Sequence, residues 1–380
     1  MKIEQKQWMA SNGWHPTSLA EANTKAQLVI VFGSTSLLKE KSFLEEMRKA
    51  YPSAYWMGCS TAGEICGVDV NDESLVLTAV QLEHTDIQGV QTKIEKAEDS
   101  LFVGEKLAKM LKHEKLVHVF VLSDGLNING TDLVKGLTKG LPNYITITGG
   151  LSGDGARFQE TLVFADGVPE KNTVAAIGFY GSRLKIGYGS LGGWDSFGPE
   201  RVVTRSRGNV LYEMDGKSAL ELYKKYLGEH AQGLPATGLL FPLSLRSQDH
   251  ETAVVRTILS VNEKDQSMTF AGTIPEGALA RLMKANFDRL IDGAAGAAQA
   301  SYAAIGSNSP DLAILISCVG RKLILKQRIE EEVESVRNIL GQRTVLTGFY
   351  SYGEISPFTP GAKCELHNQT MTITTFFEES

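Results

Sequence analysis

Long apolar runs are missing from this chain of 380 residues. No stretch reaches the roughly 18 apolar residues that a membrane-spanning helix needs, and the first residues, MKIEQKQWMASNGWHPTS, hold no signal-peptide core. We therefore expect a cytoplasmic protein with no membrane partner. An excess of positive charge is missing as well. The 38 Lys and Arg residues face 44 Asp and Glu residues, and the net charge of −6 argues against a nucleic-acid partner.

Cysteines and enzyme motifs are also scarce. Cys59, Cys66, Cys318 and Cys364 are the four cysteines, and no two of them form a CxxC pair, so a disulfide-stapled fold is excluded. The sequence has no HExxH motif, no Walker loop and no GxGxxG motif placed directly after a strand. No histidine is close in sequence to Cys59 or to the neighbouring serine. We therefore expect that the protein is not an enzyme.

The chain does contain one pattern three times. Each copy opens with a short apolar strand that ends in small residues, at 28–36, 117–125 and 312–321. Apolar residues at helical spacing follow, at 43–50, 133–137 and 329–340. A second strand then ends in a glycine followed by a carboxylate, within 56–65, 147–155 and 346–355, and a third strand closes the copy at 74–82, 173–180 and 370–377.

These repeats predict the fold class. A strand, a helix and a further strand normally form a right-handed crossover that lays the two strands side by side. We predict an α/β (α+β) fold in which repeated strand-helix-strand-strand units form mixed sheets covered by helices. Whether the units share one sheet or stack as separate sheets is left open. The length predicts two domains.

The domain boundaries follow from the spacing of the repeats. The acidic turn residues lie 90 residues apart in the first two copies and 200 residues apart in the last two, so an insertion precedes the third copy. We predict an N-terminal extension at 1–26, a first domain of two units at 27–190, and a second domain at 191–380 that holds the insertion and the third unit. Within the insertion, Leu279, Leu282, Met283 and Phe287 recur at helical spacing and predict a long amphipathic helix after Pro275.

The glycine-acid turns have two interpretations. Open sheets with crossover connections bind ligands at one end of their strands, where such turns could form a polar rim. Alternatively, each carboxylate accepts backbone N–H bonds and fixes its own turn. The candidate ligand-binding residues under the first interpretation are Gly63, Glu64, Asp154, Gly353, Glu354 and Asn368.

Several segments in this order resemble the FIST sensory domain with its amino- and carboxy-terminal halves. They are GCSTAGEI, GGLSGDGARFQETLVFADG, GNVLYEMDGKSALELYKKYLG, VVRTIL with FAGTIPEG, SCVGRKLIL, GFYSYGEISP and LHNQTMT, and the resemblance covers about Gln27 to Phe377. It implies a ligand-binding input module of bacterial signal transduction. Such modules are usually coupled to kinases, cyclases or chemoreceptors.

The segments GGWDSFGPERVVT and MKANFDRLIDGA look most like the haem-binding, nitric-oxide-sensing subgroup called NosP. This resemblance implies a sensor that binds haem, takes up nitric oxide at the iron and regulates a separate histidine kinase or cyclase. A homodimer is left open. The candidate axial ligands are His250, which we prefer as the metal ligand, and His367. Arg256 or Arg246 would meet the propionates, and Met283 and Phe287 would line an apolar wall.

A second hypothesis belongs to a different class. Glycine turns with acids and backbone donors suit a ligand that carries both an ammonium and a carboxylate group. The chain would then be a FIST module that senses a small polar metabolite such as an amino acid, without haem.

Overall fold

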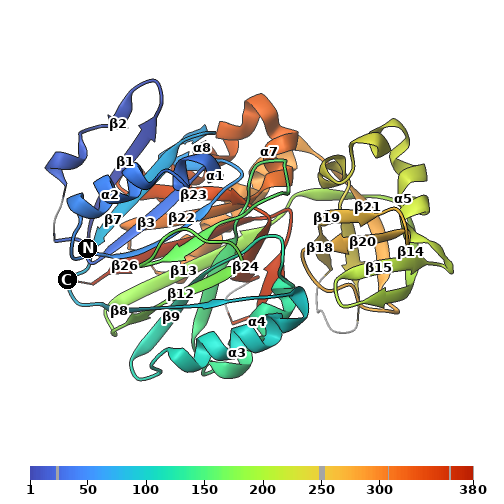
Figure 1. The fold of residues 1–380 in the computed structure, drawn as a ribbon, viewed down its shortest axis with the longest axis horizontal. Helices are drawn as coiled ribbons and strands as arrows, with labels where there is room; N and C mark the ends of the chain where they lie inside the picture. Colours follow the sequence, from blue (N-terminus) through green and yellow to red (C-terminus); the bar gives the residue numbers. More distant parts are fainter. Residues whose placement is uncertain (23–24, 248–252, 307, 359–360, 380) are drawn as a thin grey trace.

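The computed structural model describes residues 1–22, 25–247, 253–306, 308–358 and 361–379. It consists of a three-sheet body and a smaller inserted domain, residues 194–285, at one end (Figure 1). In the order of their pairing, the first sheet contains β11 (Val163–Ala165), β4 (Tyr55–Ser60), β3 (Leu28–Gly33), β7 (Leu75–Gln81), β1 (Lys2–Met9) and β2 (Gly13–His15). The second contains β25 (Cys364–His367), β24 (Gly353–Pro357), β10 (Thr146–Leu151), β9 (Leu116–Ser123), β12 (Thr173–Tyr180) and β8 (Asp86–Lys93). The third contains β13 (Leu184–Leu191), β26 (Met371–Glu378), β22 (Leu312–Cys318), β23 (Val345–Ser351), β5 (Glu64–Cys66) and β6 (Asp69–Asn71).

Helices cover the outer faces of the sheets (Figure 1). The α-helices are α1 (Thr35–Leu38), α2 (Lys41–Ala50), α3 (Ser100–Met110), α4 (Gly130–Gly140), α5 (Ala219–Leu227), α6 (Phe287–Ala304), α7 (Val319–Leu325) and α8 (Ile329–Leu340). Short 3₁₀ turns are η1 (Leu19–Glu21), η2 (Ala97–Asp99), η3 (Gly228–Gly233), η4 (Ala236–Leu240) and η5 (Lys326–Arg328). None of the helices in the described ranges combines the length and the apolar character needed to cross a bilayer.

The predicted units are confirmed, and each forms the centre of one sheet. The opening and second strands pair in parallel as β3 with β4, β9 with β10, and β22 with β23. The closing strands β7, β12 and β26 lie antiparallel on the other side of the opening strands. The mixed sheets are therefore confirmed, and the units form three sheets rather than one.

The three units also exchange strands. After the first unit β8 joins the second sheet, after the second unit β13 joins the third sheet, and β1 from the N-terminal segment completes the first sheet. The strands that follow the acidic turns cross over too, since β5 pairs with β23, β11 with β4, and β24 with β10. The second and third sheets thus borrow strands from both other units, and the first sheet borrows β11 from the second unit. This exchange holds the ends of the three units together.

The inner faces of the three sheets pack on one shared apolar core. Phe32 of the first sheet contacts Phe349 of the third with tilted rings whose centroids are 4.7 Å apart. One glycine in each second strand lies directly over its partner strand. A Cβ there would approach the carbonyl oxygen of that partner to 2.2, 1.9 and 1.9 Å, at Gly58, Gly149 and Gly348. The repeated glycines therefore allow the parallel strands to pair closely.

The inserted domain is a curled antiparallel sheet. Its order is β18 (Val254–Arg256), β17 (Leu243–Arg246), β21 (Leu279–Ala285), β14 (Trp194–Arg207), β15 (Val210–Met214), β20 (Ser267–Phe270) and β19 (Ile258–Asn262), and β16 (Lys217–Ser218) pairs with β15. The two end strands β18 and β19 are consecutive in the chain and are separated by Thr257 alone. The two edges of the sheet therefore come together at this residue, and the sheet curls around an apolar core.

The long helix predicted after Pro275 is wrong in its first half. Residues Leu279–Ala285 form β21, which pairs with β14 on one side and β17 on the other. Helix α6 begins only at Phe287, where the Asn286 side chain accepts a hydrogen bond from Arg289 N at 3.3 Å. The apolar residues of this segment have helical spacing only by coincidence. Their pairing with two neighbouring strands makes the segment a strand.

Candidate ligand site at the joint between body and inserted domain

The three glycine-acid turns meet at one end of the body. Ala62 N donates to Tyr350 O at 2.8 Å, and Gly153 N donates to Ser60 O at 2.9 Å. Tyr352 N donates to Leu151 O at 3.2 Å. Main-chain bonds therefore join all three turns, as expected when several sheets end at one place.

The two glutamates of these turns are occupied within the protein. Glu64 accepts from Thr61 Oγ1, from Ser74 N at 3.1 Å and from Ser74 Oγ at 2.8 Å. Glu354 is held in the same way by Ser351 Oγ at 2.6 Å and by Thr370 N and Oγ1 at 3.2 and 2.9 Å. Burial raises the pKa of Glu64 to about 7 and that of Glu354 to about 8, although these hydrogen bonds oppose the shift.

Asp154 fixes its turn through backbone donors. Its carboxylate accepts from the N–H groups of Phe158, Gln159 and Glu160, each at 2.9 Å, and from the Tyr352 hydroxyl. Gly63 has a φ of 137°, and Gly353 opens β24. The geometry therefore assigns these turn residues a structural task, and their ligand-binding role stays a prediction.

A chain of polar contacts runs from these turns to the inserted domain. Asn368 Nδ2 donates to Tyr352 O at 3.1 Å, and Thr257 N donates to Asn368 Oδ1 at 3.3 Å. Gln369 Nε2 donates to Thr257 Oγ1 at 3.1 Å and to Leu239 O at 3.0 Å. We call Arg256, Thr257, Tyr352, Asn368 and Gln369 the polar seam. It links the acidic turns to the bend at which β18 passes into β19.

Arg256 is the charged member of the polar seam, and it is 1% exposed. Its Nη1 donates to Leu366 O at 3.0 Å and to Val255 O at 3.2 Å. Its Nε and Nη2 make longer contacts of 3.4 Å to Thr273 O and Thr131 Oγ1. Burial lowers the pKa of Arg256 to about 10, while the charge of Glu365 raises it. Among the described residues, no carboxylate forms an ion pair with this guanidinium.

His367 lies beside the seam, and its ring is buried. Its Nε2 lies 2.8 Å from Ser356 O, and because a carbonyl only accepts, Nε2 must carry the proton. That nitrogen could therefore not ligate a metal without losing this bond. His250 lies outside the described residues. The structure thus brings together three predicted site residues, Arg256, His367 and Asn368.

The other predicted cofactor residues lie apart from the seam. Arg246 is exposed and pairs with Glu200 at 3.2 Å. Met283 packs in a small cluster with Trp194 and Leu290. Phe287 is 46% exposed beneath the guanidinium of Arg328.

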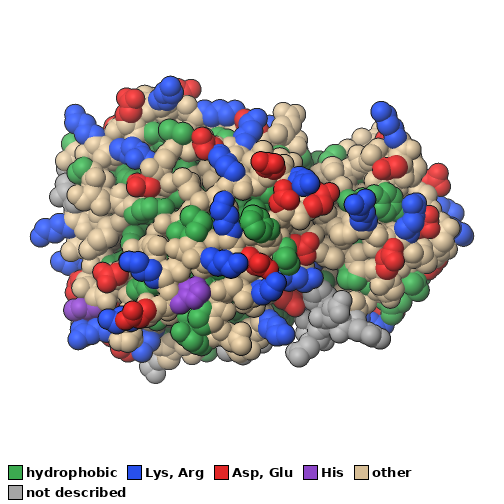
Figure 2. All heavy atoms as spheres, turned by 60° about the horizontal axis from the view of Figure 1, so that its bottom comes forward, with side chains coloured by type: hydrophobic (Ala, Val, Ile, Leu, Met, Phe, Trp, Pro, Cys, Tyr) green, Lys and Arg blue, Asp and Glu red, His purple; other side chains and the backbone are tan. Residues whose placement is uncertain are grey.

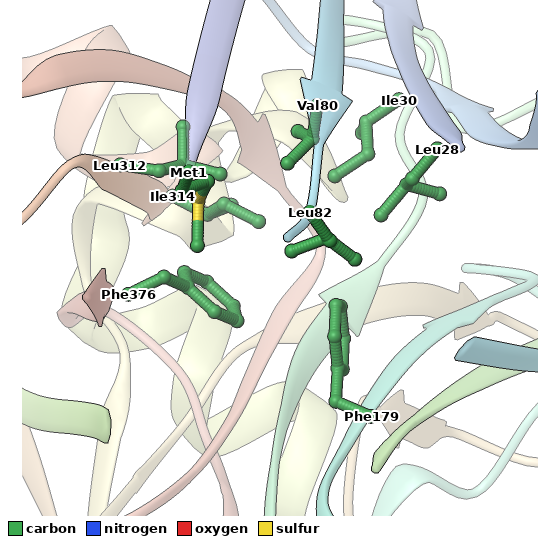
Figure 3. Close-up of a pocket in the computed structure, with 9 residues that line it drawn as sticks. All are labelled: Met1, Leu28, Ile30, Val80, Leu82, Phe179, Leu312, Ile314 and Phe376. Atoms are coloured by element: carbon green, nitrogen blue, oxygen red, sulfur yellow. The ribbon is translucent and has the colours of Figure 1, made fainter. Parts of the chain in front are cut away.

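Two hollows stand out in the described residues, and neither admits a porphyrin. The first, shown in Figure 3, lies between the sheets at the far end of the body and has a volume of about 10 Å³, room for about one water molecule. The second, in the inserted domain beside Arg201 and Tyr226, has the same volume. The residues described here form no group of three or more His, Cys, Asp and Glu that could hold a metal ion. Among the described residues, these hollows and side chains do not fit haem, so we derive no step through it. The first hollow is lined by Met1, Leu28, Ile30, Val80, Leu82, Phe179, Leu312, Ile314 and Phe376.

Sequence reasoning missed a buried ion pair at the neck of the inserted domain. Arg321 and Glu332 are fully buried and lie 2.8 Å apart. Arg321 also donates to Gly192 O at 3.0 Å and to Leu290 O at 2.6 Å, on the two chain segments that enter and leave the inserted domain. A signal was present, because Glu332 stands between Ile329 and Val336 on the apolar stripe of α8.

Comparison with known proteins supplies the family. The model of the FIST N domain matches residues 27–217, and that of the FIST C domain matches residues 219–357. An uncharacterized protein of Methanocaldococcus jannaschii is 25% identical over 293 residues, which is 70% of this chain and 56% of that protein. This chain therefore spans little more than half the length of that curated relative.

Among solved structures, a cyanuric acid hydrolase from A. caulinodans aligns with 100% of this chain and 99% of its own, at a TM-score of 0.39 and 7% identity. So low a similarity implies nothing about an activity of this chain. FIST domains are sensory ligand-binding domains of signal transduction. Since the FIST N model alone matches half of the residues and the FIST C model follows it directly, the chain belongs to the FIST family.

Proposed function

We propose that this protein is a cytoplasmic, non-enzymatic sensor. It binds a small metabolite that carries a carboxylate, such as an amino acid, at the polar seam, and it passes the change to a separate signalling protein. The observation that supports the ligand class is Arg256, a buried guanidinium whose partners are carbonyl and hydroxyl oxygens.

The chemistry of Arg256 favours an anionic ligand. A buried charge is costly unless it is paired, and three of its four contacts are 3.2 Å or longer. A carboxylate can accept two parallel N–H bonds from a guanidinium, which are stronger than bonds to carbonyls. Thr257 and Asn368 would supply further polar groups beside it.

The position of Arg256 explains how binding would produce a signal. Its carbonyl partners belong to the inserted domain and to β25 of the body. A ligand that takes over these donors must loosen contacts across the joint, so binding favours a different placement of the inserted domain. The difference in the ligand's binding free energy between the two placements of the inserted domain is the free energy available for signalling.

The finer expectation of haem, nitric oxide and a histidine kinase stays a prediction. Its preferred ligand His250 lies outside the described residues, and neither of the two hollows described above has room for a porphyrin. A small metabolite needs much less room than a porphyrin, and for that reason we favour the metabolite hypothesis.

Ligand-induced stabilisation tests the proposal. The full chain is heated with amino acids, dicarboxylates, inorganic phosphate or hemin, and the melting temperature is measured. We expect a rise with at least one carboxylate compound, loss of that rise in Arg256→Met, and an unchanged rise in the control Arg246→Met. Arg256→Lys keeps the positive charge but loses the two parallel N–H donors of the guanidinium. This variant should therefore retain only part of the rise in melting temperature.

Two outcomes would contradict the proposal. One is a Soret band with hemin in a protein that no carboxylate compound stabilises. The other is a response to carboxylates that survives in a folded Arg256→Met protein. Circular dichroism of each variant establishes that it is folded.

A further inference from the structure

Large hydrophobic side chains are exposed on α3 and just after α4. Among the described residues eight such side chains are exposed, and four of them are Leu101, Phe102, Met110 and Tyr144. Phe102 is 66% exposed and Tyr144 is 73% exposed. Clustered exposed hydrophobic groups are typical of interaction surfaces, whereas scattered ones need no explanation.

The close packing of the two helices sets their relative direction. Gly136 of α4 lies against Leu101 of α3, and Gly140 lies against Ala108, so the helices run in parallel. Tyr144 therefore follows α4 near the end of α3 that carries Met110.

On α3, Phe102, Lys106, Lys109 and Met110 recur at spacings of four, three and one residues. We call these four residues the α3 stripe. Its two hydrophobic ends are about 12 Å apart, which is about two helical turns.

The segment that carries the α3 stripe is opposite in net charge to the whole chain. Residues 100–144 contain six lysines and four acids, and one of the acids, Asp124, is buried, whereas the chain has a net charge of −6. Lys139 pairs with Glu105 at 2.7 Å, and Lys106 Nζ donates to Thr92 Oγ1 at 2.8 Å. Lys109 and Lys112 form no ion pair within the described ranges. Figure 2 shows this side of the molecule, where Lys and Arg side chains lie around hydrophobic ones.

We propose that the α3 stripe docks an acidic amphipathic helix of a partner protein. Hydrophobic anchors two turns apart match the apolar face of a helix, and the lysines between them select glutamate or aspartate on the partner. A membrane fits less well, because the net charge of −6 opposes binding to an anionic lipid surface. This surface is on the body and does not include the polar seam, so the inference is independent of the proposed ligand.

A designed peptide pair tests the docking proposal. One fluorescein-labelled helix carries leucines seven residues apart with glutamates between them, and its twin carries lysines in place of the glutamates. Fluorescence anisotropy with the full chain should show binding of the acidic peptide about tenfold tighter than that of its twin. The double variant K106E/K109E should lose about tenfold in affinity, as should Phe102→Ser. K41E/K49E, with the same change of charge on α2, should bind like the wild type.

Three results would overturn the proposal. The first is equal binding of both peptides, or binding of neither. The second is sedimentation with phosphatidylserine-containing vesicles that K106E/K109E abolishes, which would identify a membrane surface. The third is a dimer in light scattering that the same variant dissociates, which would identify a second copy as the occupant.

Discussion

Replacing Arg321 with methionine should lower the free energy of unfolding by about 3–5 kcal/mol. The change leaves the Glu332 carboxylate buried without its cation, and it removes donors from Gly192 O and Leu290 O. A buried charge that loses its partner retains its full desolvation cost. Chemical denaturation of the full chain, followed by circular dichroism, measures the loss.

Two further variants show whether the burial of the pair causes this effect. Arg328→Met breaks an exposed pair with Glu331 and should cost less than about 1 kcal/mol. Arg321→Met combined with Glu332→Leu removes both charges, and it should be more stable than Arg321→Met alone. A double variant that is no more stable than the single one would show that the ion pair is not the source of the loss.

Because of the raised pKa of Glu354, the free energy of unfolding should fall as the pH rises from 6.5 to 8. Its pKa in the folded protein is about 8, above its ordinary value, so in this interval the folded state holds a proton that the unfolded state has lost. Each pH unit then lowers the free energy of unfolding by about 1.4 kcal/mol, or about 2 kcal/mol over the interval. Glu64, with a pKa of about 7, adds a smaller loss of the same sign.

Glu354→Gln should remove about 2 kcal/mol of this pH dependence. The amide oxygen can still accept from Thr370 N, so the turn keeps a partner for that donor. The exposed Glu330→Gln on α8 is the matched control and should leave the dependence unchanged. Stability is obtained from denaturant titrations at several pH values. An identical slope in wild type and Glu354→Gln would refute the assignment.

A second buried group responds in the opposite direction at lower pH. Burial lowers the pKa of His118 to about 3, so the unfolded state binds a proton that the folded state excludes. Its contribution is nearly complete above about pH 6.5 and is lost as the pH falls toward 3. From pH 6.5 to 8 only the end of this titration remains, and it adds a change of about 0.4 kcal/mol with the opposite sign.

Local patterns in the sequence predicted the units of this fold but not their assembly. Apolar runs and turn glycines are local signals, so β3, β9 and β22 with their helices were correctly predicted. The exchange of β5, β8 and β13 between units depends on contacts between distant residues, and one sequence contains no direct sign of them. The same limit applies to β21, whose strand pairing overrode a helical spacing.

The candidate site, too, was predictable in its residue types but not in its contacts between distant segments. Residue type alone marked the acidic turns and Arg256 as candidates, but not that the carboxylates would be occupied by nearby hydroxyl and N–H groups. Thr257 and Tyr352 carried no signal, because a threonine or a tyrosine in a strand region is most often a packing residue. They belong to the seam only because distant segments meet there.

Backbone hydrogen exchange tests the central claim, that ligand binding at the polar seam alters the joint between body and inserted domain. The full chain is compared with and without the carboxylate compound that raises its melting temperature most. We predict altered exchange at residues 254–258 and 366–370 in the wild type, and none in Arg256→Met. Altered exchange confined to other parts of the chain, with these two segments unaffected, would contradict the account.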